Sequence, residues 1–364
     1  MTRKTQKPLC TGDFWQKLPK PFFVIAPMAN VTDFAFRTMF AKYGKPDVMW
    51  TEFVSADGLC SPVGKKKLIR DLEFAPKERP IVAQLFTGHP DKMFGAAKLV
   101  AKLGFDGIDI NMGCPDRSVE KQGGGSAMIK APENALKILA AAREGWVKSA
   151  GQGSKLTPVP ISIKTRIGYN SVDWKWLRLL LEQNLPALTV HLRTRKEMSD
   201  VPAHWELMPE IVKLRDEVQK DISPEKRTLI IGNGDVESMV DAQAKVVKYG
   251  CDGVMIGRGI FGKPWFFKNR GKAERMNGEE KSPVERLKIM LEHAKLFNKL
   301  YCGTGNNRHK NFAVMKKHFK AYVSGWDGAK ELRVQLMGVD SYKEVEKIVK
   351  SYTKTHLALL KGKI

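Results

Sequence analysis

Cysteine is scarce in this sequence and long apolar runs are missing, and both features limit what the protein can be. The 364 residues include five cysteines, an odd number with no CxxC pair. This argues against a disulfide framework and a zinc site, and we expect no metal. No run of about 18 apolar residues occurs, so we expect no transmembrane helix and no membrane partner. The N-terminus has no apolar core of signal-peptide length, and a reducing cytoplasm is the expected location.

Acidic residues are few relative to basic ones. The chain has 62 Lys and Arg against 39 Asp and Glu, a formal net charge of +23. Such an excess of one sign repels itself and is expected mainly where a polyanion is bound. Nucleic acid is the favoured polyanion, and an anionic membrane is the alternative. A hydrophobic content of 43% indicates a globular protein with a sizeable core.

Short apolar runs rich in β-branched residues alternate with amphipathic stretches up to about Gly271. Strands that alternate with helices pair in parallel through βαβ units, and eight units over about 250 residues have the size of a (β/α)8 TIM barrel. An open doubly wound α/β sheet is the alternative, but no GxGxxG motif follows the first strand. The predicted strands are Phe22–Ala26, Val48–Phe53, Ile81–Gln84, Gly107–Asn111, Ile161–Thr165, Ala187–His191, Thr228–Gly232 and Gly253–Ile256.

The C-terminal part has a different pattern, with apolar residues at helical spacing and no convincing strand. Ser282 and Pro283 predict the N-cap and first turn of a helix. Residues 281–364 hold 18 Lys and Arg against 7 Asp and Glu. We therefore predict an N-terminal extension at 1–20, a barrel domain at 21–272 and a smaller, basic, all-helical domain at 281–364 that binds RNA.

Cations and aromatic residues are interleaved in this basic segment. Lys316, Lys317 and Lys320 are candidates to contact RNA phosphates. Phe312 and Phe319, with Tyr322 after them, either take part in that surface or anchor a helix in the core. The sequence leaves both interpretations open.

Polar residues follow almost every predicted strand, and the reactive groups of a (β/α)8 barrel lie at the C-terminal strand ends. This position makes them candidates for binding or catalysis. The candidates at these strand ends, which include some apolar residues and glycines beside the polar ones, are Pro27, Met28 and Ala29, then Glu52, Gln84, Asn111, Lys164, Arg166, His191, Arg195, Asn233, Gly234, Asp235, Gly257 and Arg258.

Glycine-rich turns follow the seventh and eighth strands, where this fold commonly binds phosphate through backbone N–H groups. The turns contain Asn233–Asp235 and Gly257-Arg258, and the alternative is that the glycines only permit tight turns. Lys164 could stabilise negative charge on a reduced flavin or form a Schiff base. Gln84 and His191 could hydrogen-bond the edge of a flavin.

Cys114 is the sharpest single candidate. It lies between Gly113 and Pro115, which places the thiol on a loop at the barrel mouth. A thiol with a pKa of about 8.5 is protonated at neutral pH and can act as a general acid, whereas a lowered pKa would make it a nucleophile. The spacing leaves both roles open. Gly123–Gly125 is either a flexible lid or the glycine-rich start of a helix.

Together these residues resemble the dihydrouridine synthase family. The specific motif is Asp109-Ile110-Asn111-Met112-Gly113-Cys114-Pro115. Weaker segments follow in the family's order and span the barrel, with a looser likeness beyond it. These segments are Ala26–Ala29, Thr32-Asp33, Phe36-Arg37, Glu52, Gln84-Leu85, Lys164–Arg166, His191, Arg193–Arg195, Asn233–Asp235, Gly257-Arg258, Pro264-Trp265, Lys317–Phe319 and Glu331–Arg333.

The resemblance implies an FMN-containing barrel and a helical domain that helps hold tRNA. NADPH would reduce FMN, hydride would pass from flavin N5 to C6 of a uracil ring, and Cys114 would protonate C5 to give 5,6-dihydrouridine. Asn111 and Arg166 would contact the base, and we also expect Arg195 to contact the RNA. FMN would be bound by Pro27, Met28, Ala29, Gln84, Lys164, Asn233, Gly234, Asp235, Gly257 and Arg258.

Other functions are compatible with parts of this pattern. A small-molecule flavin oxidoreductase similar to dihydroorotate dehydrogenase would share the barrel but would not need the basic tail. An aldolase-type enzyme would use Lys164 without a flavin, and a barrel that had lost catalysis would only bind RNA. The RNA could also be other than tRNA, and a bulky RNA substrate makes a monomer the expected state.

Overall fold

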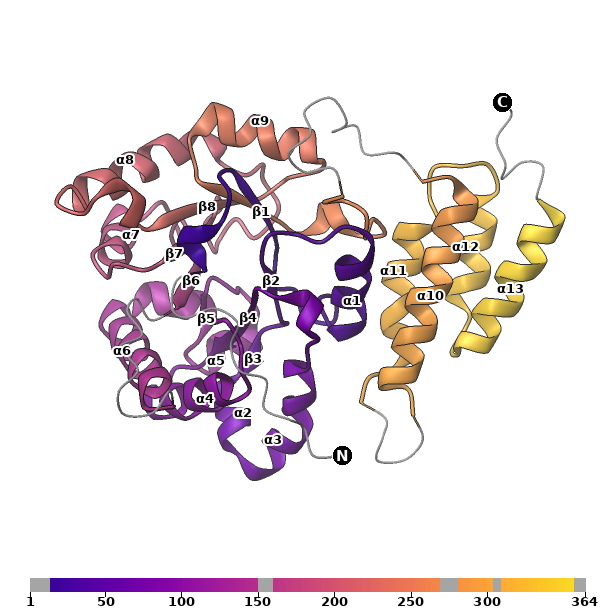
Figure 1. Ribbon diagram of the computed structural model, residues 1–364, viewed down its shortest axis with the longest axis horizontal. Helices are drawn as coiled ribbons and strands as arrows, with labels where there is room; N and C mark the ends of the chain where they lie inside the picture. The colour runs from indigo at the N-terminus through magenta and orange to yellow at the C-terminus, as the bar shows by residue number, and fades with distance from the viewer. Residues whose placement is uncertain (1–13, 150–159, 269–280, 304–308, 357–364) are drawn as a thin grey trace. The chain divides into compact units, whose positions relative to one another are not determined.

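The computed structural model describes residues 14–149, 160–268, 281–303 and 309–356, and its elements are labelled in Figure 1. By its internal contacts the chain forms two compact units, Met1–Ala29 with Pro46–Gly257, and Asn30–Lys45 with Arg258–Ile364. The segment Asn30–Lys45 therefore groups with the C-terminal part of the chain. The division into 1–20, 21–272 and 281–364 stays a prediction, and Cys10 lies outside the described residues.

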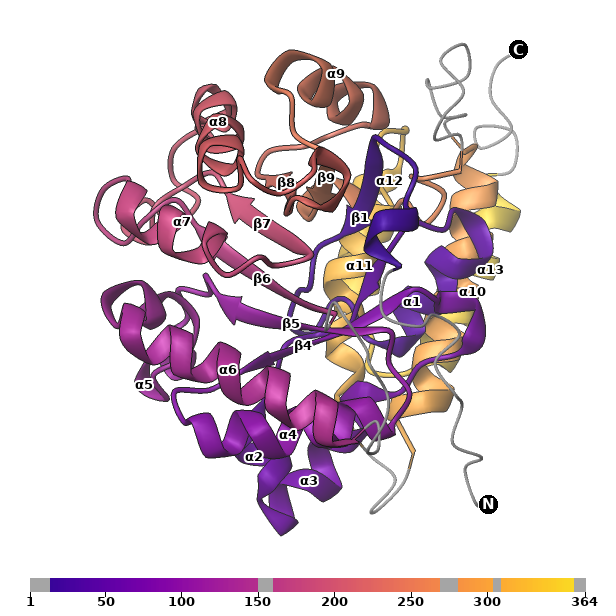
Figure 2. The same ribbon diagram turned by 60° about the vertical axis from the view of Figure 1, so that its left-hand side comes forward.

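The first unit is a ring of parallel strands. Their order is β1-β9-β8-β7-β6-β5-β4-β2, and a parallel bridge from Val24 to Val48 joins β1 to β2 and closes the ring. Figure 2 shows β5, β6 and β7 running in the same direction. The prediction of a (β/α)8 barrel is confirmed. The strands are β1 (Phe22–Ile25), β2 (Met49–Trp50), β4 (Ile81–Phe86), β5 (Gly107–Met112), β6 (Ile161–Arg166), β7 (Ala187–His191), β8 (Leu229–Asn233) and β9 (Gly253–Ile256).

The second predicted strand is wrong in its extent. We expected a continuous strand over Val48–Phe53, but β2 ends at Trp50 and a separate short strand, β3 (Val54–Ser55), pairs with β4 further along. Trp50 pairs with Val82, whereas Val54 pairs with Leu85. Three residues of this segment thus stand opposite two of β4, and an extra residue interrupts a ladder as a bulge does.

Amphipathic helices surround the strands. On α4, the residues Met93, Ala96, Ala97 and Val100 are buried at helical spacing. Gly145 of α6 lets the two helices approach, because a Cβ there would lie 2.3 Å from the carbonyl oxygen of Phe94. The helices are α2 (Ala56–Cys60), α3 (Pro62–Leu68), α4 (Pro90–Lys102), α5 (Arg117–Lys121), α6 (Pro132–Ser149), α7 (Trp174–Leu181), α8 (Met208–Val218) and α9 (Met239–Tyr249).

The inside of the barrel is apolar at the starts and middles of its strands. Trp15, which precedes β1, is 1% exposed and packs against Trp50 with ring centroids 5.7 Å apart. The first described residues therefore belong to the barrel core. The buried members of this core are Phe14, Trp15, Phe22, Val24, Ala26, Val48, Trp50, Val82, Ala187, Leu229, Ile231 and Met255.

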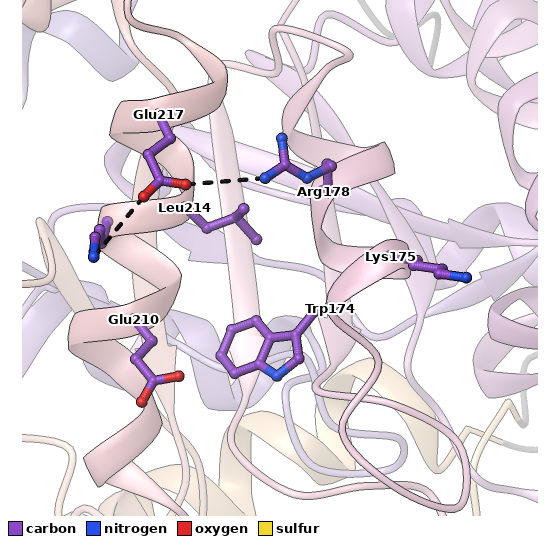
Figure 3. Close-up of a pocket in the computed structure, with 7 residues that line it drawn as sticks. Trp174, Lys175, Arg178, Glu210, Leu214 and Glu217 are labelled. Carbon is purple, nitrogen blue, oxygen red and sulfur yellow. Dashed lines mark ion pairs between the residues drawn. The ribbon is translucent and has the colours of Figure 1, made fainter.

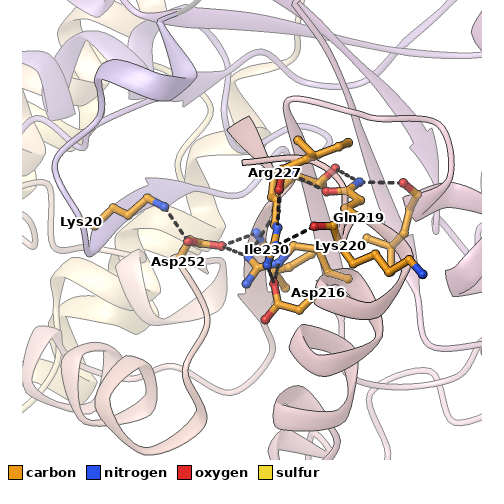
Figure 4. A network of polar contacts seen from close by, with 11 residues as sticks. Lys20, Asp216, Gln219, Lys220, Arg227, Ile230 and Asp252 are labelled. Carbon is orange, nitrogen blue, oxygen red and sulfur yellow. Dashed lines mark hydrogen bonds and ion pairs between the residues drawn. The ribbon is translucent and has the colours of Figure 1, made fainter. Parts of the chain in front are cut away.

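A polar network fixes the starts of β8 and β9 (Figure 4). Oδ2 of Asp252 accepts hydrogen bonds from Arg215 Nη1 at 2.7 Å and from the Ile230 amide at 2.8 Å. Its Oδ1 accepts from Lys20 Nζ at 2.9 Å, while Asp216 bridges Arg215 and Arg227. Both oxygens of Asp252 thus have donors, which is the arrangement that a partly buried charge needs.

The second unit is a helical bundle with one apolar core. Ser282 and Glu285 form a capping box at the start of α10, so the predicted helix start is confirmed. Phe312, Phe319 and Tyr322 are all buried, which identifies them as core anchors. Among the described helices none is long and apolar enough to span a lipid bilayer. The helices are α1 (Phe34–Tyr43), α10 (Pro283–Tyr301), α11 (Met315–Tyr322), α12 (Ala329–Met337) and α13 (Tyr342–Thr355).

Two histidines are buried side by side in this bundle. The rings of His293 and His318 lie 4.9 Å apart between centroids, and both are at most 1% exposed. Among the described residues, neither His293 Nε2 nor either ring nitrogen of His318 has a hydrogen-bond partner. Burial lowers the pKa of His293 to about 3 and holds that of His318 well below its usual value. Both imidazoles are therefore neutral in the folded bundle.

This pair predicts loss of stability in mild acid. An unfolded histidine takes up a proton below about pH 6.5, whereas these folded histidines do not. The free energy of unfolding should fall as pH drops from about 6.5, by up to about 1.4 kcal/mol per pH unit for each histidine. Urea unfolding followed by circular dichroism between pH 7 and 5 measures the slope. His318→Phe should lower the slope of unfolding free energy against pH by about the contribution of one histidine. A slope equal to that of the wild type would contradict the conclusion that His318 is neutral in the folded bundle.

Candidate active site

Polar side chains gather at the C-terminal ends of the strands because every second residue of a barrel strand points inward. The barrel core below them is apolar. The register places the following residues side by side: Gln84 with Asp109, Asp109 with Ser162, Asn111 with Lys164, Arg166 with His191, and His191 with Asn233.

A chain of side-chain hydrogen bonds crosses from β4 to β6. Asn111 Nδ2 donates to Gln84 Oε1 at 3.0 Å, and Gln84 Nε2 donates to Asp109 Oδ2 at 2.6 Å. Ser162 Oγ donates to Asp109 Oδ1 at 2.6 Å. Since both oxygens of the carboxylate accept, Asp109 fixes the amide of Gln84, which in turn fixes that of Asn111.

Asp109 was not among the predicted site residues, although it belongs to the motif that carries the resemblance. Its side chain is fully buried, and burial raises its pKa to about 6 against the opposing effects of Ser162, Gln84 and Lys164. The period of two along β5 could have found it, because Asp109 and Asn111 must share the inner face of the barrel.

Asn111 holds the loop that carries Cys114. Its Oδ1 accepts from the backbone N–H of Gly113 at 3.1 Å and of Cys114 at 2.9 Å. The backbone N–H of Ser126 donates to the carbonyl oxygen of Cys114 at 2.9 Å. The half-buried thiol thus sits on a backbone fixed from both sides, and burial raises its pKa. A raised pKa keeps the thiol protonated at neutral pH, which favours the general acid over the nucleophile.

The glycine run after Cys114 is packed and does not form an open lid. A Cβ on Gly125, where φ is +57°, would lie 2.5 Å from the carbonyl oxygen of Cys114. A Cβ on Gly124 would lie 3.2 Å from the Phe86 ring. Gly125 and Ser126 are buried at the start of a 3-10 helix, η4 (Gly125–Lys130). The structure therefore agrees with the start of a helix and not with the flexible lid.

Lys164 extends into the barrel mouth from β6. Burial and the charge of Arg166 lower its pKa to about 8, against the attraction of Asp109. Its ammonium makes no hydrogen bond or salt bridge to the described residues, and neighbouring Thr189 Oγ1 is buried without a partner among them. Lys164 is half-buried, and a cation partly removed from water is costly without a bonded acceptor, which a ligand could supply.

Arg166 is bonded to the surrounding loops. Its Nε donates to the carbonyl oxygen of Gly113 at 2.8 Å, and its Nη1 donates to those of Thr194 and Met198 at 2.8 and 2.9 Å. The side chain is 6% exposed, and burial lowers its pKa to about 10. Arg166 thus joins the loop of Cys114 to the loop after β7, and only Nη2 keeps no bond to the described residues.

His191 at the end of β7 is oriented by Arg193. Arg193 Nη1 lies 3.2 Å from His191 Nε2, and since a guanidinium can only donate, Nε2 must accept. The ring proton of the neutral imidazole then lies on Nδ1. Arg193 also pairs with Asp235, whose Oδ2 accepts from the Ala203 amide at 2.9 Å.

The two glycine-rich turns expose backbone donors. Asn233 Nδ2 donates to the carbonyl oxygen of Met255 at 2.8 Å, which ties the two turns together. The N–H groups of Gly234 and Gly257 donate no hydrogen bond to the described residues. A Cβ on Gly257 would only reach ordinary contact, 3.7 Å from Ala26 Cβ and 3.8 Å from Met28 Sδ. Packing within the protein therefore does not require glycine at position 257. A ligand that lies close to the backbone there would require it.

The other predicted residues are placed as follows. Pro27 is buried, Met28 half-buried and Ala29 exposed after β1. Arg195 is paired with Glu120 at 2.6 Å. Arg258, Lys316, Lys317 and Lys320 belong to the second unit, where Arg258, Lys317 and Lys320 are exposed and Lys316 lies 3.5 Å from Asp340. Within the described ranges no group of three or more His, Cys, Asp or Glu could hold a metal ion.

Known proteins resemble this chain over nearly its full length. It is 39% identical over 349 residues to a probable tRNA-dihydrouridine synthase 2 of Bacillus subtilis (strain 168), covering 95% of this chain and 98% of the relative. It is 39% identical over 342 residues to a probable tRNA-dihydrouridine synthase of Staphylococcus aureus (strain COL), covering 93% and 95%. A solved morphinone reductase mutant in complex with tetrahydroNAD has a TM-score of 0.46 and 14% identity over 72% of this chain and 88% of that one. That last likeness carries no weight for function.

A family model also matches most of the chain. Residues 24–357 match the family model of dihydrouridine synthase (Dus). The match includes the Asn111–Cys114 loop, Lys164 and the two glycine-rich turns. The chain therefore belongs to the dihydrouridine synthase family of enzymes.

Proposed function

We propose that this protein reduces the C5=C6 bond of uridines in tRNA to 5,6-dihydrouridine, with FMN as its cofactor and NADPH as the electron donor. The observation that carries the proposal is the Cys114 loop, whose backbone Asn111 holds at a barrel mouth that also contains Lys164, a cation with no bonded acceptor among the described residues. Burial raises the pKa of the Cys114 thiol, which favours its protonated form. Family membership and the tRNA-dihydrouridine synthase names of two relatives support the substrate.

The residues of the mouth fit FMN. Phosphate needs backbone N–H donors, which Gly234 and Gly257 offer, together with the charge of Arg258. The reduced ring carries negative charge, which the free ammonium of Lys164 would stabilise. Gln84 and His191 would hydrogen-bond the ring edge, while Pro27, Met28, Ala29, Asn233 and Asp235 would line the site. FMN reduced by NADPH would supply the hydride that adds to C6.

Cys114 supplies the proton that completes the reduction. The neutral thiol donates its proton to C5 of the uracil, and the thiolate that remains lies in the field of Lys164 and Arg166. Both cations favour the thiolate, so they lower the cost of proton release from a half-buried site. The thiolate then takes a proton from water. Asn111 fixes the loop and, with Arg166 Nη2, would hydrogen-bond the base.

The rest of the chain would hold the RNA. A net charge of +23 gives the long-range attraction that phosphates require. Lys317 and Lys320 are exposed on α11, where they would contact the backbone alongside Lys316. A uridine must leave its stack to enter a barrel mouth, which favours weakly paired positions of the RNA. A monomer and the cytoplasm stay the expected state and location.

The first prediction concerns the reaction. Incubation with NADPH and unmodified tRNA should produce dihydrouridine, measured by mass spectrometry. Cys114→Ala should slow its formation by about 10²- to 10⁴-fold, because the acid is lost, while the flavin content stays constant. Cys60→Ala, which removes an exposed thiol elsewhere, is the matched control. Equal rates for wild type and Cys114→Ala would show that Cys114 is not the proton donor.

The second prediction concerns the cofactor. The purified protein should be yellow, with absorbance near about 370 and 450 nm. Gly257→Ala should leave the melting temperature of the flavin-free protein unchanged, since a Cβ has room, yet weaken FMN binding at least about tenfold by blocking the approach to the backbone. Gly338→Ala is the control, since its Cβ would also have room. A colourless protein that cannot be reconstituted would favour the Schiff-base use of Lys164.

The third prediction concerns the RNA. Reversing Lys316, Lys317 and Lys320 to Glu should weaken tRNA binding. The slope of log K against log salt should become shallower by about 0.7 to 0.9 for each phosphate that the variant no longer neutralises. A control with the same total charge reverses Lys343, Lys347 and Lys350 on α13. If both triple variants changed the salt slope equally, net charge and not the α11 surface would explain the binding.

A further inference from the structure

The Glu120 cluster, which consists of Glu120, Ser126, Tyr169 and Arg195, lies beside the Cys114 loop. Glu120 is on α5, directly after that loop. Its Oε1 receives Arg195 Nε at 3.1 Å, Ser126 Oγ at 2.9 Å and Tyr169 Oη at 3.2 Å. Its Oε2 receives Arg195 Nη2 at 2.6 Å. One carboxylate thus collects four donors, two of them from a bidentate guanidinium.

Ser126 connects this carboxylate to Cys114. Its Oγ lies 2.9 Å from both Glu120 Oε1 and the carbonyl oxygen of Cys114, and its backbone N–H lies 2.9 Å from that same carbonyl. A hydroxyl has only one proton, and an ionised carboxylate is the stronger acceptor. The hydroxyl of Ser126 therefore donates to Glu120, and this bond helps to fix the position of Ser126. The backbone N–H of Ser126 then donates to the carbonyl oxygen of Cys114.

The cluster joins three loops of the barrel mouth. Glu120 and Ser126 follow β5, Tyr169 follows β6 and Arg195 follows β7. The backbone N–H of Arg195 also donates to the carbonyl oxygen of Gly168 at 2.9 Å. Because the contacts come from three consecutive strands, movement of any one loop would disturb the position of Cys114.

Charge keeps the cluster together. The side chains of Glu120 and Arg195 are 14% and 26% exposed. Burial alone would raise the pKa of Glu120, but Arg195, Ser126 and Tyr169 together hold it below its ordinary value, and Glu120 raises the pKa of Arg195. Arg195, expected from the sequence to contact RNA, thus has two of its three nitrogens bound to Glu120.

We propose that Glu120 is a positioning residue for the reduction: held by Arg195, it fixes Ser126, which in turn holds the backbone of Cys114 and so the place from which the thiol acts. This inference rests on the proposed function for its consequence in catalysis. Its structural part, control of the Cys114 loop by Glu120, stands independently of any cofactor or RNA.

The first measurement is the reactivity of Cys114 in the full chain. Glu120→Gln keeps the size of the side chain but removes the charge that binds Arg195 and Ser126. Alkylation of Cys114 by iodoacetamide across pH 7 to 10, followed by peptide mass spectrometry, should become several-fold faster as the loop loosens. Cys114→Ala identifies the peptide. An unchanged alkylation profile overturns the structural part.

The second measurement separates the two halves of the reaction. In single turnovers of the reduced holoenzyme at saturating tRNA, Glu120→Gln should slow uridine reduction by about 10- to 100-fold, as small misplacements of reacting groups do. Flavin reduction by NADPH should stay at the wild-type rate. In a double-mutant cycle, Ser126→Ala should add little to Glu120→Gln, because both act along the same path.

The matched control is an Arg–Glu pair on the outer surface of the barrel. Glu217 lies 3.9 Å from Arg178, between α7 and α8 (Figure 3), and Glu217→Gln should change neither alkylation nor turnover. Equal losses in both half-reactions with a lower melting temperature would mean a merely structural role and overturn the proposal. If wild type formed no dihydrouridine, the proposed function would fail, and the alkylation profile would still decide the structural part.

Discussion

The side-chain oxygen of Asn111 accepts two backbone N–H groups, and the site depends on this contact. It sets the path of the chain from the end of β5 through Gly113 to Cys114. An amide that must accept with its oxygen has a fixed orientation, so its Nδ2 is directed to Gln84 and, beyond it, to Asp109. The buried carboxylate of Asp109 thereby helps to determine where the loop places the thiol of Cys114. Neither Asp109 nor Gln84 needs to touch Cys114 for this to hold.

In this parallel barrel the starts of the strands contribute mainly to stability, and the ends of the strands carry the groups for chemistry. At the strand starts, Trp15 and its apolar neighbours fill the interior, and Asp252 has donors for both of its oxygens. At the strand ends, the buried carboxylate of Asp109 interacts with the half-buried ammonium of Lys164, and their pKa values shift in opposite directions, up for Asp109 and down for Lys164. Shifts of this kind need a low-dielectric surrounding, which the apolar core supplies. The core is thus a condition for the chemistry of the mouth.

The sequence was sufficient for the barrel and for Cys114, and insufficient for the partners of individual side chains. Alternating apolar runs predicted eight strands, because period and length are local properties. Gly113 and Pro115 placed Cys114 on a loop for the same reason. Arg195 and Glu120 are 75 residues apart, and only the register of three strands brings them together. The grouping of Asn30–Lys45 with the bundle has a similar origin: Phe34 and Lys42 bond to Tyr301 and Glu292 of α10.

Unbonded polar groups at the mouth are themselves an argument for a ligand. A buried donor without an acceptor costs about 1 to 3 kcal/mol, and more when charged. Thr189 Oγ1 and the backbone N–H of Gly234 are buried without an acceptor among the described residues, so each would carry such a cost if the barrel mouth held only protein. At the strand starts both oxygens of Asp252 have donors, and the groups of the barrel core that are unbonded among the described residues are the uncharged indole N–H groups of Trp15 and Trp50. At the mouth, in contrast, the unbonded donors include the ammonium of Lys164, whose charge interacts with Cys114, and backbone N–H groups of two glycine-rich turns. A cation and free backbone N–H groups are the donors that an anionic molecule needs, so this end of the barrel is suited to binding one.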